Sequence, residues 1–161
     1  MIFLWLMQSV QAEVFIEADE DLVYKVVRDL ESYPEFMPLV HEVRILSKNP
    51  EETRIEYEWV AQVPILGIKE RSLQEVRYKH ETKSAHFWQK EGRLSHLEGY
   101  RTIQSVPGGT MIRTQVYFKL GSPFQFSLGK GLIQSLFQQN TQATLDSIKK
   151  RCESLSSKET L

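Results

Sequence analysis

The chain has 161 residues, enough for one domain with a sizeable core and too few for two. Hydrophobic residues make up 41% of it and charged residues 25%, a globular balance that excludes disordered and fibrous architectures. The formal net charge is -1 and the basic residues form no stripe, so no DNA partner is expected.

Residues 1–7 are apolar, and the first basic residue of the chain is Lys25. A secretory signal needs a positive start and a longer apolar stretch, and a membrane-spanning helix needs about 20 apolar residues. We therefore expect an apolar lead-in that packs on the domain or on a partner. A weakly membrane-associated or self-associating tip, formed by Phe3 and Trp5, and a signal remnant are the alternatives. The expected location is cytoplasmic or peripheral to a membrane.

Residues 10–17 alternate between apolar and polar, and this period of two predicts a strand with one buried face. Asp19 is suited to cap a helix that has acidic residues in its first turn and apolar residues at helical spacing up to Leu30. The helix is expected to end near Pro34, because the residue before a proline disfavours the helical conformation. Residues 33–38 leave room only for a short second turn of helix.

Six further strands are predicted, separated by turns that carry proline, glycine or polar residues. They cover residues 41–48, 53–63, 68–78, 84–90, 94–104 and the segment from the 106–109 turn to Leu120. A long helix follows over residues 132–152, with one stripe formed by Ile133, Leu136, Phe137, Asn140, Ala143, Thr144, Ile148 and Cys152. The polar tail, residues 153–161, is expected to fray.

Sequential strands joined by short turns form an antiparallel meander whose apolar face must be covered. The final helix is the only predicted element that is large enough to cover it. The prediction is therefore a single α+β domain over residues 8–152. A bent sheet wrapped around one helix seldom fills completely, so we expect an internal apolar cavity.

Three segments carry a resemblance to a known superfamily. Residues 29–38 follow the pattern D-x-x-x-Y-P-x-F-x-P at the exit of the first helix. Residues 91–100 resemble the strand pattern E-G-x-F … x-G-x-W, with Leu94 and Tyr100 in place of Phe and Trp, and residues 107–110 agree as well. The chain thus resembles the START-like, helix-grip superfamily of polyketide cyclases/dehydrases and lipid-transfer proteins.

This resemblance covers residues 8–152 and implies a curved antiparallel sheet of about seven strands wrapped around a long C-terminal helix. It also implies a first helix and a short second helix after strand 1. Within the superfamily the chain looks most similar to the coenzyme Q-binding START-domain type, which includes a bacterial ribosome-association toxin. Such folds host binders, cyclases and regulators, so the function must be argued from the site.

Nine residues are expected to line the cavity: Tyr57, Trp59, Glu70, Phe87, Tyr100, Val116, Phe118, Phe137 and Asn140. Ordinary core packing is the alternative for the aromatic residues. A buried Glu70, together with Tyr57, would be the candidate catalytic acid or base, unless a slip in register exposes it. Asn140 would bond either the polar head of a ligand or a neighbouring loop carbonyl.

The four histidines are not at metal-ligand spacing, and the single cysteine, Cys152, excludes a disulfide within the chain. The sequence also contains no phosphate-binding loop and no nucleophile elbow. We therefore predict neither a metal nor a cofactor.

These features favour non-catalytic binding or transport of a hydrophobic small molecule, such as a quinone, a lipid or a polyketide-like compound. One alternative is an aromatase/cyclase-type enzyme in which Glu70 and Tyr57 move protons. The other is an interaction module similar to the ribosome-association toxin. The near-neutral charge disfavours this last alternative, because ribosome surfaces are rich in phosphate.

Overall fold

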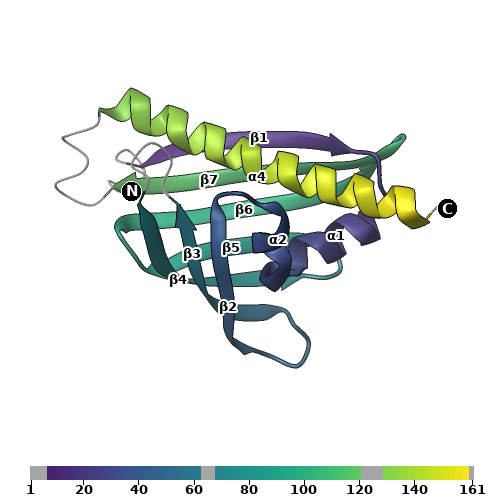
Figure 1. The fold of residues 1–161 in the computed structure, drawn as a ribbon, viewed down its shortest axis with the longest axis horizontal. Helices are drawn as coiled ribbons and strands as arrows, with labels where there is room; N and C mark the ends of the chain where they lie inside the picture. Colours follow the sequence, from purple (N-terminus) through teal and green to yellow (C-terminus); the bar gives the residue numbers. More distant parts are fainter. Residues whose placement is uncertain (1–6, 63–67, 121–128, 160–161) are drawn as a thin grey trace.

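The computed structural model describes residues 7–62, 68–120 and 129–159. In chain order the elements are β1 (Gln8–Ile16), α1 (Glu20–Arg28), a 3₁₀ turn (Leu30–Ser32), α2 (Tyr33–Phe36), β2 (Val40–Lys48), β3 (Arg54–Gln62), β4 (Lys69–Lys79), β5 (Ser84–Glu91), β6 (Leu94–Val106), β7 (Gly109–Leu120) and α4 (Lys130–Glu159). The strands form one antiparallel sheet in the order β1-β7-β6-β5-β4-β3-β2. Helix α4 runs along the β1 end of this sheet, and α1 lies near the C-terminal half of α4 (Figure 1). The predicted helix-grip fold is confirmed.

The first helix ends earlier than predicted. Asp19 caps α1 as expected, because its carboxylate accepts the backbone N–H of Leu22 at 2.9 Å. The helix stops at Arg28 rather than near Pro34, since the backbone of Asp29 leaves the helical region. Pro34 instead lies in the first turn of α2, where its missing N–H costs nothing.

Helix α4 is longer than predicted, because it covers Lys130–Glu159 rather than residues 132–152. Residues 153–159 of the expected polar tail are helical instead of frayed. Leu155 explains the difference, since it extends the apolar stripe by one turn and packs against the core. A helix of 30 residues is roughly 45 Å long, enough to follow the whole of β1.

Side chains of α4 bond the outer edge of β1, which is the end strand of the sheet. Four of them donate hydrogen bonds to alternate backbone carbonyls: Gln134 to Ser9 (2.6 Å), Gln138 to Gln11 (2.8 Å), Gln142 to Glu13 (3.5 Å) and Lys149 to Phe15 (2.7 Å). For the three glutamines the spacing matches, because four residues of helix and two residues of strand each advance about 6 to 7 Å. This polar seam satisfies groups that an exposed edge would offer to another chain.

The seam also sets the rotation of α4 about its own axis. With the three glutamines turned to β1, Thr141 and Leu145 face the interior and are buried. Asn140 and Ala143, which the sequence pattern placed in the buried stripe, are exposed. Hydrophobic spacing alone could not detect this rotation, because the deciding contacts are polar and run from side chain to backbone.

We predict that Gln138→Ala lowers the free energy of unfolding by about 1 kcal/mol, and that alanine at 134, 138 and 142 together lowers it by about 2–3 kcal/mol. Urea denaturation measures both. The triple variant should also self-associate through β1, which light scattering would detect. Gln139→Ala is the matched control, because that side chain bonds only Ser135 of its own helix. A triple variant as stable as its control would contradict the role of the seam.

The outer face of the sheet holds a buried carboxylate among cations. Glu75 is only 2% exposed and lies 3.1 Å from both Arg54 and Arg77 and 3.5 Å from Lys90. Burial raises the pKa of Glu75, but hydrogen bonds from the two arginines outweigh it and bring the pKa below its ordinary value of 4.5. The carboxylate therefore stabilises the sheet in its charged form.

Glu75→Gln should reveal this charge in the pH dependence of stability. Because the folded-state pKa is depressed, the stabilisation is present above pH 4.5 and is lost as the pH falls through the folded-state value. We expect a loss of about 1–2 kcal/mol at pH 7, since the cationic partners are half-exposed. The difference from wild type in urea unfolding should shrink towards pH 3. A loss of the same size at both pH values would mean that shape, not charge, matters at this position.

Candidate functional site

A cavity of about 160 Å³ lies between the middle of α4 and the inner face of the sheet. Its walls come from the end of α1, from α2, from strands β3 to β7 and from α4. Six of the nine residues predicted from the sequence line it: Tyr57, Trp59, Phe87, Val116, Phe137 and Asn140. Phe118 lies just behind this wall, fully buried, with its ring stacked on Phe137 at a centroid distance of 3.7 Å.

The cavity exists because α4 is anchored at its two ends and carries small side chains between them. Near its start, Ile133 packs with Phe118 in a small apolar cluster. Towards its end, Leu145, Ile148 and Cys152 are fully buried in the main core. Between these anchors, Phe137 stacks on Phe118 of the sheet, and the later α4 residues that line the cavity, Asn140, Thr141 and Thr144, carry short side chains. The middle of the helix therefore spans a hollow.

Two of the predicted cavity residues lie elsewhere. Tyr100 is 45% exposed on the outer face, because the β5–β6 register pairs it with His86 and places the ring of Phe87 over Gly99. Glu70 lies on the same, inner face of the sheet as Gln74. It is at the start of β4, however, beyond the residues that line the cavity. There it forms an ion pair with Arg93 at 2.9 Å. Glu70 is thus not placed to act on a ligand in this cavity.

The sequence reasoning missed Arg101, whose side chain lines the cavity. Its Nε donates to the hydroxyl of Thr114 at 3.0 Å, and its guanidinium lies 5.5 Å from the centroid of the Phe87 ring. The signal was present in the sequence. Ile103 is the buried apolar anchor of β6, and the period of two puts Arg101 on the same face as Ile103, opposite Tyr100.

Arg101 is unusual among the arginines of the chain. All nine arginines lie in the described residues, and seven of them form ion pairs with carboxylates at their surface positions. Within these residues, Arg101 and Arg28 have no such partner. A guanidinium remains charged at any physiological pH, so the cavity holds an uncompensated positive charge.

Three tyrosines surround this charge. The hydroxyl of Tyr33 donates to the carbonyl of Val27 at 2.5 Å, and that of Tyr57 donates to Gln74 at 2.8 Å. Burial raises the pKa of Tyr33, Tyr57 and Tyr78 above the ordinary value of 10.0, although the positive charge of Arg101 acts in the opposite direction. All three phenols are therefore neutral near pH 7, and they supply hydroxyl groups rather than a base.

The sequence matches the profile of the family described as polyketide cyclase / dehydrase and lipid transport over residues 16–149. The chain belongs to this family. A search of curated proteins found no match. Membership in this family indicates binding of hydrophobic small molecules or cyclase activity. The coenzyme Q-binding type stays a prediction.

Solved structures share the family fold over nearly the whole chain. The protein TTHA0849 from Thermus thermophilus is 26% identical, with a TM-score of 0.84 over 92% of this chain and 99% of that one. The Zhui aromatase/cyclase from Streptomyces sp. R1128 is 18% identical, with a TM-score of 0.80 over 91% and 94%. A START superfamily protein from Mycobacterium smegmatis is 17% identical, with a TM-score of 0.78 over 92% and 98%. The last two likenesses bear on the fold alone.

Two further observations concern the described residues only. No helix among them is both long and apolar enough to span a membrane. They also contain no group of three His, Cys, Asp or Glu side chains that could hold a metal ion. The predicted lead-in, residues 1–7, lies outside the described residues except for Met7, so its packing or membrane role stays a prediction.

A larger side chain that fills the cavity should stabilise the protein and weaken its binding of ligands. Thr141 is buried and its hydroxyl donates only to the carbonyl of Phe137 in the same helix, at 2.7 Å. We expect Thr141→Leu to raise the free energy of unfolding by about 0.5–2 kcal/mol and to reduce binding of naphthalene, measured by NMR titration. Ala143→Leu on the exposed side of α4 is the control and should change neither quantity. Destabilisation by Thr141→Leu would mean that the space is already packed.

Proposed function

We propose that the protein binds an amphipathic small molecule, with its apolar body among the aromatic side chains and an oxygen-bearing end at Arg101. The observation that carries the proposal is the charge of Arg101, which has no carboxylate partner within the described residues. A charge in a partly apolar cavity is stabilised most by a partner that bonds it directly. A ligand carboxylate, phenolate or carbonyl oxygen would be such a partner.

The remaining polar groups support the same orientation. The Nε of Arg101 donates to Thr114 and its side chain also hydrogen-bonds Tyr33, so the remaining N–H groups of the guanidinium are the ones that a ligand would use. Tyr33 and Tyr57 lie in edge-to-face contact with Trp59, at centroid distances of 6.0 and 6.2 Å. These three rings form an apolar wall next to the charge. An aromatic body with an oxygen substituent matches both parts of the cavity.

The size of the cavity narrows the ligand class. Its volume of about 160 Å³ is close to that of the roughly 150 Å³ cavity that takes up benzene in another protein. A ring system with an oxygen substituent, such as the head of a quinone or one end of a polyketide-like molecule, fits this space. A whole lipid chain would require the cavity to widen.

A cyclase reaction is the second candidate, and Arg101 is the observation in its favour. A guanidinium beside a carbonyl oxygen would stabilise the negative charge of an enolate that forms during ring closure. Such a reaction also needs a group that accepts a proton. Among the described residues that line the cavity there is no Asp, Glu or His, and burial holds the pKa of the tyrosines too high for them to act as bases. Binding is therefore the function that the site supports best.

Arg101→Leu tests the proposal with two probes of one shape and different charge, 2-naphthoate and 2-naphthamide. We expect 2-naphthoate to bind the wild type and to lose affinity about 10- to 100-fold in the variant, while 2-naphthamide changes little. NMR titration read at the Trp59 indole measures both affinities. Arg113→Leu removes an equal charge from the outer face, where Arg113 pairs with Glu13 at 2.9 Å, and is the control. If 2-naphthoate binds both variants as it binds the wild type, the proposal fails.

A further inference from the structure

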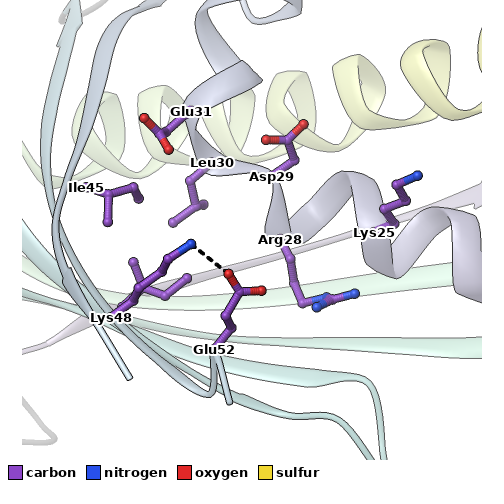
Figure 2. A pocket seen from close by; sticks show the side chains of 9 residues that line it. Lys25, Arg28, Asp29, Leu30, Glu31, Ile45, Lys48 and Glu52 are labelled. Carbon is purple, nitrogen blue, oxygen red and sulfur yellow. Dashed lines mark hydrogen bonds and ion pairs between the residues drawn. The ribbon is translucent and has the colours of Figure 1, made fainter. Parts of the chain in front are cut away.

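A second hollow, a cleft of about 300 Å³, opens between α1 and the end of the β2–β3 hairpin. Figure 2 shows its two sides: Arg28, Lys25 and the 3₁₀ turn on one, and Lys48 and Glu52 on the other. Ile45 and Leu30 form its apolar floor. The cleft is larger than the cavity, and charged side chains surround most of it.

A chain of hydrogen bonds holds the two sides of this cleft together. His80 lies between them: its Nε2 bonds the carbonyl of Glu51 at 2.8 Å and its Nδ1 bonds the hydroxyl of Tyr24 at 2.6 Å. A carbonyl can only accept, so Nε2 of His80 donates the hydrogen bond to Glu51. The buried Tyr24 is thereby fixed, and with it the guanidinium of Arg28, which lies 4.4 Å from the centroid of the Tyr24 ring.

Arg28 is the second arginine without a carboxylate partner. Within the described residues its Nε is buried and has no hydrogen-bond acceptor, although buried polar groups almost always have one. The guanidinium is thus held in place by the Tyr24 ring while its donor groups remain unmatched. An acceptor that enters the cleft would satisfy them.

The charges around Arg28 favour an anion as that acceptor. Lys48 and Glu52 pair with each other at 2.7 Å on the side of the cleft that faces Arg28, so Glu52 already has a cationic partner. Figure 2 shows the carboxylates of Asp29 and Glu31 pointing away from the Arg28 guanidinium. Asp29 also accepts a hydrogen bond from the hydroxyl of Ser32 at 2.7 Å. Arg28 helps to lower the pKa of Glu52, but within the described residues none of the acids that line the cleft forms an ion pair with Arg28.

We propose that this cleft is a second binding site, for a phosphate-type oxyanion. Arg28 binds this anion through the N–H donors that lie in the plane of its guanidinium. Arginine suits such a group because two parallel hydrogen bonds from the guanidinium match two oxygens. The oxyanion is either a free phosphate or the head group of a molecule whose apolar part lies in the cavity. The second source is sterically close, because Leu30 lines both the cleft and the cavity. The site itself does not depend on the cavity being occupied.

The test titrates the full-length protein with inorganic phosphate and with hexyl phosphate, followed by NMR and calorimetry. We expect both anions to bind the wild type and Arg28→Gln to weaken each at least about tenfold. Arg28→Lys keeps the charge but lacks Nε and the planar fork, so it should also bind less tightly than wild type. If thermal unfolding shows that Arg28→Gln is not folded, the anion affinity of Arg28→Lys tests the proposal instead. Arg44→Gln is the matched control, because Arg44 is exposed and lies 3.4 Å from Glu58.

The two anions separate the two sources. Equal affinities identify a site for free phosphate, whereas tighter binding of hexyl phosphate that is reduced by Leu30→Phe identifies a head-group site next to the cavity. Both results support the proposal. Unchanged binding in both Arg28 variants, or an equal loss in Arg44→Gln, would overturn it. If hexyl phosphate binding is lost in Arg101→Leu but unchanged in the two Arg28 variants, the proposed cleft site is also overturned, while the cavity function stays in place.

Discussion

The polar seam between α4 and β1 is the constraint on which the rest of the structure depends. Apolar packing alone would let a long amphipathic helix rotate or slide over the sheet, because dispersion contacts are not directional. The hydrogen bonds from Gln134, Gln138 and Gln142 to alternate carbonyls of β1 fix both the rotation and the register of the helix. That setting turns Thr141 towards the sheet and leaves the middle of the helix over a hollow. A binding cavity thus follows from contacts made outside it.

Much of the fold could be predicted from the sequence, because it depends on local rules. The period of two located each strand, and Asp19 and Pro34 marked where helices start, although the proline opened α2 instead of ending α1. The full length of α4 was missed, since its last turn depends on Leu155 meeting the core. Predictions failed wherever a polar or tertiary contact outweighed the local pattern.

The site was predicted only in part, for a related physical reason. Its aromatic wall follows from strand parity, because Tyr57, Trp59 and Phe87 lie on the inner face of the sheet and line the cavity. Tyr100 was expected in the cavity, but Ile103 is the buried residue that decides the parity of β6, and Arg101 shares its face. An exposed aromatic residue and an inward charge both break the hydrophobic pattern. Functional residues are expected to do so, because binding requires groups that packing alone would not select.

The distribution of charge connects the two hollows. Four carboxylates of the sheet, those of Glu13, Glu58, Glu70 and Glu75, lie on its outer face or at its rim, where arginine partners hold them. Among the nine arginines, all within the described part of the chain, only Arg28 and Arg101 lack such a partner, and each lines one hollow. The net charge is close to zero, so this separation is local and does not arise from an excess of basic residues. An oxygen-bearing ligand would meet guanidinium donors in either hollow, whereas a cationic ligand in the cavity would meet the like charge of Arg101 with no lining carboxylate to offset it. Such a site gains specificity in two ways, because it attracts ligands that carry oxygen acceptors and repels ligands that carry positive charge.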